Sequence, residues 1–227
     1  MKRSKIAAAV LALAVVGTSG AVVAEKPVGI TKEAWVAQPF NSKVKDGTVM
    51  SAKVAGHQIM RNQDNKNTVN PSFAKTSRPC PPFCIQPSTL APGVETIGEV
   101  ELISYAQRMD AGDKSIVVVD SRTPDWVGKG TVPGAINIPW TALNPAKGAT
   151  PIEMAEIMQN TFGVTESEGI FNFTDARTAV MFCNGMWCGQ SPNNIKNLLK
   201  MGYPSHKIKW YRGGMQDWEI LGLTTVK

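Results

Sequence analysis

The sequence predicts an α/β fold, with a mostly parallel sheet that carries helices on both faces. Two continuous apolar runs, residues 115–122 (SIVVVDSR) and 178–182 (TAVMF), have the pattern of strands that are buried on both faces. Segments with helical periodicity alternate with these runs from residue 93 to the C-terminus. Because parallel strands need crossover connections, the alternation indicates a parallel sheet within one compact domain over residues 93–227.

Each element of this domain has a local signature. In residues 99–109 (EVELISYAQRM), Val100, Ile103 and Tyr105 or Ala106 fall on one helical face. The further elements are a turn and short strand at 132–138, an amphipathic helix at 152–162, a helix at 193–201, a strand at 207–211 and a helix at 215–221. Gly202 ends the helix before it, and Gly213 and Gly214 precede the last helix.

Residues 1–24 have the pattern of an export signal. Lys2, Arg3 and Lys5 form a basic start, residues 6–16 an apolar stretch, and residues 22–24 a small-residue cleavage site before Glu25. The alternative is an uncleaved membrane anchor, but the apolar stretch is shorter than the roughly 20 residues of a bilayer span. We therefore expect cleavage, export (to the bacterial periplasm) and no membrane association of the mature protein.

The charge of the mature chain argues against a nucleic-acid partner. The whole chain has a net charge of +6, and removal of the signal leaves 21 Lys and Arg against 18 Asp and Glu, a net charge of +3. No block of lysines and no run that mixes arginine with aromatic residues remains in the mature chain.

Residues 25–92 are expected to form an irregular N-terminal extension without a core of its own. Clusters of Asn, Pro, Ser and charged residues mark loops, as in RNQDNKNTVNPS and the proline-rich SRPCPPFCIQP, and the apolar residues follow no regular period. The extension is expected to be ordered, if at all, by lying over the domain that follows it.

The four cysteines form two local pairs, Cys80 with Cys84 and Cys183 with Cys188. In an oxidising compartment four cysteines usually indicate two structural disulfides, yet local pairs gain little from loop closure and are often redox-active. Cys80 and Cys84 either form a small disulfide that ties down the extension or act as a second thiol pair that exchanges with the first. Neither pair has the spacing or the histidines of a zinc site, so no metal is expected.

The segment 178–191 (TAVMFCNGMWCGQS) predicts a site for sulfur chemistry. Cys183 ends a buried strand, where α/β sheets place their ligands, and the helix that opens at Ser191 supplies unpaired amide N–H groups. Such a place lowers the pKa of a thiol, so we favour Cys183 as a nucleophile over a cysteine that only packs in the core. The residues expected to bind substrate through this loop are Asn184, Gly185, Met186, Trp187, Gly189, Gln190 and Ser191.

Two further residues of the site have several interpretations. Cys188 is either the nucleophile itself, a resolving thiol or the partner of Cys183 in a structural disulfide, and we favour the resolving thiol. Arg212, just before Gly213, is the best candidate for a cation that reaches the pocket from a neighbouring strand end.

Four separated pieces of the sequence resemble the rhodanese family of sulfurtransferases. VVVDSRTPDWVGKGTVPGAINIP (117–139) is similar to the first signature of the family, residues 178–199 to its active-site segment, and MGYPSHKIKWYRGGMQDW (201–218) to its closing strand. The helix before Asp120 lies in the expected place. The resemblance implies a rhodanese-like five-stranded mostly parallel sheet, transfer of a sulfane sulfur through a cysteine persulfide, no cofactor, and structural support near the site from Asp120 and Arg122. From the residues alone, Asp120 and Arg122 equally fit a surface ion pair.

The active-site loop departs from the family pattern. It is longer, carries a second cysteine, and has Gln190 where a basic residue is common. A dianion such as thiosulfate gains from a fixed positive charge. The absence of a basic residue at Gln190 therefore argues against thiosulfate as the physiological donor. Cysteine phosphatases of related fold need an arginine at the same place, which argues against phosphatase activity.

The favoured function is therefore a rhodanese-type sulfurtransferase. It moves sulfane sulfur from a small donor such as thiosulfate or polysulfide, through Cys183, to a thiol, cyanide or protein acceptor. The alternatives are a thiol–disulfide oxidoreductase that uses Cys183 and Cys188, and a non-catalytic rhodanese-like binding module.

Overall fold

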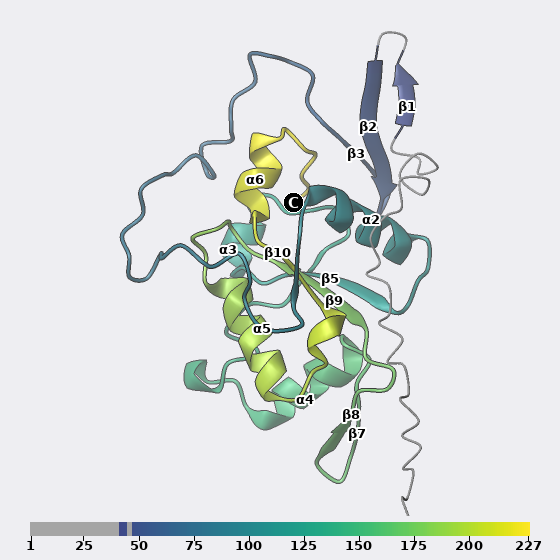
Figure 1. Ribbon diagram of the computed structural model, residues 1–227, viewed down its shortest axis with the longest axis vertical. Coiled ribbons are helices and arrows are strands. Elements are labelled where there is room, and N and C mark those ends of the chain that lie inside the picture. Colours follow the sequence, from purple (N-terminus) through teal and green to yellow (C-terminus); the bar gives the residue numbers. More distant parts are fainter. Residues whose placement is uncertain (1–40, 45–46) are drawn as a thin grey trace, which may run out of the picture.

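The computed structural model describes residues 41–44 and 47–227, and the side chains from residue 52 onwards. Its centre is a five-stranded sheet in the order β4-β10-β9-β5-β6, in which every neighbouring pair is parallel (Figure 1). The strands are β4 (Glu95–Ile97), β5 (Ile116–Asp120), β6 (Ile136–Asn137), β9 (Thr178–Phe182) and β10 (Ile208–Tyr211). The predicted α/β class and the five-stranded parallel sheet are confirmed.

The central strands β5 and β9 are buried because both faces of the sheet are covered. In β9, Val180 and Phe182 pack into one apolar cluster, together with Leu102 and Trp218. The alternate residues Ala179 and Met181 pack into a second cluster on the other face. This two-sided burial explains why both strands are continuous apolar runs rather than alternating ones.

Helices of two sets cover the sheet. On the face of the first cluster lie α2 (Glu99–Asp110) and α6 (Gly214–Ile220), and on the other face lie α4 (Pro151–Asn160) and α5 (Gln190–Lys200). Short helical segments are α3 (Pro124–Val127), η1 (Pro145–Lys147) and η2 (Ser205–Lys207). Thr150 and Glu153 form a capping box that fixes the start of α4. On α2, Leu102 is buried beside the expected Ile103, Tyr105 and Ala106, whereas Val100 is half-buried.

Three details differ from the sequence expectation. Helix α5 begins at Gln190, one residue before the expected opening at Ser191 and three before the expected helical run 193–201, since Gly189 is its N-cap and Pro192 fits in a first helical turn. Strand β4, an edge strand that pairs only with β10, is not predicted from the sequence. Its three residues are too few to give a periodic pattern. The hairpin of β7 (Thr165–Ser167) and β8 (Ile170–Asn172) is mostly exposed and therefore lacks an apolar signature.

The N-terminal extension is more regular than its sequence indicates. Strands β1 (Asn41–Val44), β2 (Gly47–Val54) and β3 (His57–Met60) form an antiparallel sheet. Ala52, Val54 and Ile59 are buried in the same cluster as helix α2, so these strands gain their burial from the following domain. Residues 61–92 contain no helix or strand, and in Figure 1 they run as a long loop that starts at β3 and passes α6 and α3.

The predicted signal peptide, residues 1–24, lies outside the described residues. Among the residues that are described, no helix is both long and apolar enough to cross a membrane.

Candidate active site

Cys183 follows directly on β9, at the carboxyl end of the sheet. Its carbonyl oxygen accepts a hydrogen bond from the Met215 amide at 2.9 Å, and that of Asn184 accepts one from the Gln216 amide at 2.9 Å. Gly214 has a φ of +59°, and a side chain there would collide with the Cys183 carbonyl. The Gly213–Gly214 turn therefore lets the first turn of α6 hold the start of the cysteine loop.

The sulfur of Cys183 is buried among hydrogen-bond donors. The Oγ of Ser191 donates to Cys183 Sγ at 3.1 Å, and the indole Nε1 of Trp210 donates to the same Oγ at 3.1 Å. Burial raises the pKa of the Cys183 thiol. Hydrogen bonds from the Cys188 thiol, from Ser191 and from the Gly185 amide lower this pKa by more, to about 7. A large fraction of Cys183 is therefore thiolate near neutral pH.

Cys188 is the other free cysteine, and it is buried too. Burial raises the pKa of its thiol, and the charge on the neighbouring Cys183 raises it further. The two thiols are in contact, but only Cys188 lines the cavity at this end of the sheet. The pair thus consists of a thiolate held by hydrogen bonds and a protonated thiol at the wall of the cavity.

The cavity beside Cys188 has a volume of about 360 Å³. Five of the residues expected to bind substrate or react line it, namely Asn184, Trp187, Cys188, Gly189 and Gln190. Six lining residues were not expected from the sequence: Arg78, Pro82, Phe83, Trp126, Trp140 and Asn193. The walls are thus largely aromatic, and part of them comes from the N-terminal extension.

The remaining predicted loop residues lie elsewhere around the sulfur. Ser191 and the amide of Gly185 contact Cys183 rather than the cavity. Gly185 has a φ of +157°, and a Cβ there would lie 3.1 Å from the side-chain oxygen of Gln216. Met186 is exposed, and its carbonyl oxygen accepts a hydrogen bond from the Gln86 amide.

Arg212 does not line the cavity, although its position in the sequence suggested a cation for the pocket. Its guanidinium donates to the carbonyl oxygen of Gln86 at 2.7 Å and to that of Pro87 at 3.1 Å. Arg212 therefore anchors the extension to the domain, because both acceptors belong to the extension. Its guanidinium is bound there and not at the cavity.

The cation at the cavity is Arg78 instead. Its guanidinium carbon lies 4.0 Å from the ring centre of Trp187, 5.2 Å from that of Phe83 and 5.9 Å from that of Trp126. No sequence pattern marks Arg78, because it lies in the aperiodic extension more than one hundred residues before Cys183. Only the path of the extension brings it to the site.

The segment around Arg78 is fastened at several points. A disulfide joins Cys80 to Cys84, the Phe83 ring packs edge-on against Trp187 with centroids 5.6 Å apart, and the Gln86 amide donates to the Met186 carbonyl at 2.8 Å. These contacts fix one wall of the cavity onto the cysteine loop.

Asp120 and Arg122 form a buried ion pair rather than a surface one. Both side chains are at most 1% exposed, with Arg122 Nη2 2.6 Å from Asp120 Oδ2. Arg122 also donates to the carbonyl oxygens of Gly130 at 2.7 Å and Trp126 at 3.2 Å, and to Asn184 Oδ1 at 3.5 Å. The pair thus supports α3 and the first loop residue after Cys183, without reaching the cavity itself.

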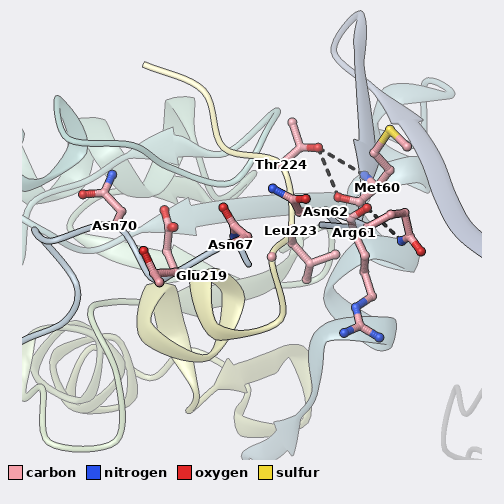
Figure 2. Close-up of a pocket in the computed structure, with 11 residues that line it drawn as sticks. Met60, Arg61, Asn62, Asn67, Asn70, Glu219, Leu223 and Thr224 are labelled. Atoms are coloured by element: carbon pink, nitrogen blue, oxygen red, sulfur yellow. Dashed lines mark hydrogen bonds between the residues drawn. The ribbon is translucent and has the colours of Figure 1, made fainter. Parts of the chain in front are cut away.

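A second cavity of about 560 Å³ lies away from the cysteines. Figure 2 shows Asn67 and Glu219 near one another, and Met60 and Arg61 beside Thr224 of the C-terminal tail. One carboxylate oxygen of Glu219 is buried without a hydrogen-bond partner, and burial raises the pKa of this carboxyl. No residue with a nucleophilic sulfur lines this cavity, so it is separate from the candidate active site.

Within the described part of the chain, no group of three His, Cys, Asp or Glu side chains is placed to hold a metal ion. The chemistry that the cysteine site itself supports is nucleophilic attack by a thiolate, with amide and hydroxyl donors ready to stabilise a sulfur anion.

Comparison with known proteins identifies a matching family. The model of the family described as Rhodanese-like domain matches residues 103–221, more than half of the chain. No curated protein matches. The rhodanese-like domain of an Anabaena protein is 15% identical, with a TM-score of 0.37, and covers 58% of this chain and 77% of its own.

Two further solved structures have similar sequence identity, coverage of this chain and TM-score. A Rhodopseudomonas palustris protein of unknown function is 20% identical over 59% of this chain and 85% of its own, with a TM-score of 0.38. A human single-domain sulfurtransferase is 22% identical over 55% of this chain and 95% of its own, with a TM-score of 0.32. On the match of the family model to residues 103–221, the chain belongs to the rhodanese-like family.

Proposed function

We propose that this protein is a sulfurtransferase in which Cys183 carries the transferred sulfur as a persulfide. The observation that carries the proposal is the set of donors around one sulfur: the Ser191 hydroxyl at 3.1 Å, the amides of Gly185 and Ser191, and the Cys188 thiol, which together lower the pKa of Cys183 to about 7. A site that stabilises a thiolate in this way also stabilises the terminal sulfur anion of a persulfide.

The reaction has two steps. The Cys183 thiolate attacks the outer sulfur of a donor, the sulfur–sulfur bond of the donor breaks, and the leaving group departs with the electron pair. An acceptor thiolate or cyanide then attacks the outer sulfur of the Cys183 persulfide, and the thiolate of Cys183 is released again. Both steps are displacements at sulfur, so no external oxidant or reductant takes part.

Cys188 is proposed as a resolving thiol that forms a disulfide with Cys183 when the site is oxidised, and not as the acceptor of the transferred sulfur. It lines the cavity, whereas Cys183 is buried and does not line it. The raised pKa of Cys188 keeps it protonated near neutral pH, and its thiol donates to Gln190 Oε1 at 3.7 Å while remaining beside the Cys183 sulfur.

Sulfur transfer to cyanide or to a thiol, measured with the wild type and with Cys183→Ser, tests the proposal. We expect turnover to fall by roughly a thousandfold or more, as happens when a catalytic nucleophile is removed. Ser104→Ala, a substitution on helix α2 away from the site, serves as the control and is expected to leave turnover unchanged. Undiminished turnover in Cys183→Ser would contradict the proposal.

The contact between the Cys183 and Cys188 thiols also favours a second candidate, a thiol–disulfide oxidoreductase. Mass spectrometry of the intact protein after incubation with a polysulfide separates the two. A sulfurtransferase gains one sulfur atom per transfer site, whereas an oxidoreductase shows only the loss of two hydrogens. A rhodanese-like binding module without catalysis shows neither change.

Export to an oxidising compartment, such as the bacterial periplasm, belongs to the same proposal. The Cys80–Cys84 disulfide supports it, because disulfides persist in such compartments. N-terminal sequencing of the protein from its native compartment is expected to begin at or close to Glu25, and a chain that still begins at Met1 would contradict export with cleavage.

A further inference from the structure

Arg78 places an unneutralised positive charge at the wall of the active-site cavity. None of the residues that line this cavity is acidic, and no ion pair among the described residues includes Arg78. The Nε of Arg78 is buried and has no hydrogen-bond partner within the part of the chain that is described. The two Nη groups of Arg78 also make no hydrogen bond to a described residue and are not among the buried atoms, so they remain available to a ligand that accepts from them.

The orientation of Arg78 is fixed by aromatic rings rather than by hydrogen bonds. Its guanidinium lies over the Trp187 ring at 4.0 Å, with Phe83 and Trp126 within 5.9 Å. Stacking occupies the face of the guanidinium and leaves its N–H edge free for a planar or tetrahedral oxyanion. Two lysines add positive charge nearby, since Lys129 Nζ lies 3.9 Å from the Trp126 ring centre and Lys147 Nζ 5.5 Å from that of Trp140.

The rest of the cavity suits an apolar body. Trp126, Trp140 and Trp187 contribute three indoles, and Phe83 a further ring. The volume of about 360 Å³ lies in the range of sites for organic ligands, about 300–1,000 Å³, and is larger than a small inorganic dianion needs. The cavity therefore combines an anion-binding edge with aromatic walls, next to Cys188.

We propose that Arg78 and the surrounding indoles bind the donor, and that the donor is an organic anion with a terminal sulfane sulfur, such as an aryl thiosulfonate. This inference rests on the proposed function and names its substrate class. The sulfonyl oxygens accept hydrogen bonds from Arg78, and the organic group lies against Trp126 and Trp140. The N-terminal extension thus supplies the cation that the cysteine loop lacks at Gln190.

The transfer balances without a further reagent. The Cys183 thiolate bonds to the outer sulfur of R–SO₂–S⁻, the bond between the two sulfurs of the donor breaks, and R–SO₂⁻ leaves with the electron pair. The products are the Cys183 persulfide anion and a sulfinate, so two negative charges stand on each side.

Binding of benzenesulfonate tests the site independently of transfer, because this anion has the same aromatic sulfonyl group but no sulfane sulfur. Calorimetry and quenching of indole fluorescence measure its affinity for the wild type and for Arg78→Gln, Arg78→Lys and Trp126→Ala. We expect Arg78→Gln to weaken binding at least tenfold, as the loss of a charge-assisted hydrogen-bond pair implies. Arg78→Lys, which keeps the charge but not the planar fork, is expected to bind with intermediate affinity.

Arg108→Gln is the matched control, because Arg108 lies on helix α2 and pairs with Asp113 at the surface. It removes the same charge and is expected to leave the affinity unchanged. Equal affinity in Arg78→Gln and the wild type, or an equal loss in Arg108→Gln, would overturn the assignment of Arg78.

Persulfide formation with benzenethiosulfonate, methanethiosulfonate and thiosulfate completes the test. The aryl donor is expected to react at least tenfold faster at low concentration than the other two, and Trp126→Ala is expected to reduce this preference. If persulfide forms equally well from thiosulfate, the inference fails while the proposed function stands. If benzenesulfonate binds through Arg78 but no donor yields a persulfide, the proposed function fails, and with it the donor role of the site.

Discussion

The Ser191 hydroxyl donates a hydrogen bond to the Cys183 sulfur at 3.1 Å, and Trp210 holds the hydroxyl in place from strand β10. The indole donor of Trp210 occupies a lone pair of Ser191 Oγ, so the hydroxyl proton points to the sulfur. Two neighbouring strands and the first turn of α5 thereby combine to stabilise one anion. This short chain of hydrogen bonds is completely buried, so water does not screen it.

Replacement of Ser191 by alanine tests this chain. A hydrogen bond to a charged group contributes about 1.5–3 kcal/mol, so Ser191→Ala is expected to raise the pKa of Cys183 by about one unit or more relative to the same background with Ser191 intact. The rate of alkylation against pH, measured in a Cys188→Ser background, reports this pKa directly. Ser104→Ala in the same background is the control.

The same titration applied to Cys183→Ser gives the pKa of Cys188. We expect it to lie above that of Cys183, because burial raises the pKa of the Cys188 thiol. A Ser191→Ala profile that coincides with the control, or a Cys188 that titrates below Cys183, would contradict the assignment of Cys183 as the thiolate.

The contact between the two loop thiols predicts a redox gate. Mild oxidation is expected to join Cys183 to Cys188, which blocks sulfur transfer, and a thiol reductant is expected to restore it by exchange. Cys188→Ser should keep transferase activity and lose its sensitivity to oxidation. Activity assays before and after treatment with oxidant, with disulfide mapping of the same samples, measure this. Inactivity of Cys188→Ser under reducing conditions would show instead that Cys188 takes part in the catalytic step.

The Cys80–Cys84 disulfide is expected to act on donor binding more than on chemistry. It stiffens the segment that carries Phe83 and lies next to Arg78, and ordering one loose side chain costs about 0.5–1.5 kcal/mol. The double variant Cys80→Ser/Cys84→Ser should therefore raise the KM for the donor roughly two- to tenfold with little change in kcat. The free energy of unfolding should fall by about 2 kcal/mol or less, since the closed loop is short.

Steady-state kinetics and thermal or denaturant unfolding of this double variant measure both effects. The pH profile of Cys183 alkylation serves as the internal control and should not shift, because neither cysteine of the disulfide contacts Cys183. A fall in kcat with an unchanged KM would contradict the role of the segment in donor binding.

The parts of the site that depend on local sequence could be predicted from it. Strand β9, Cys183 at its end and the helix that follows are continuous in the chain, and a buried strand followed by a helix start has a recognisable composition. The parallel pairing of the strands follows from the alternation of strands and helices, and their number from the resemblance to rhodaneses. The position of Cys183 at the end of a strand can therefore be predicted from the local sequence.

The parts that depend on long-range packing could not be predicted. Arg78 lies in a segment without periodicity, and only the contacts of Phe83 with Trp187 and of Gln86 with Met186 bring it to the cavity. Arg212 lies at the strand end where a pocket cation was expected, but the backbone of Gln86 and Pro87 binds its guanidinium. The extension thus binds Arg212, the expected cation, and places Arg78 at the cavity in its stead. No local sequence pattern indicates either contact.

Localising the transferred sulfur tests the account most directly. The wild type, Cys183→Ser and Cys188→Ser are each incubated with one equivalent of a sulfane-sulfur donor, alkylated and mapped by peptide mass spectrometry. We predict one additional sulfur atom on Cys183 in the wild type and in Cys188→Ser, and none on any cysteine of Cys183→Ser. An additional sulfur on Cys188 in Cys183→Ser, with none on Cys183 in the other two proteins, would contradict the account.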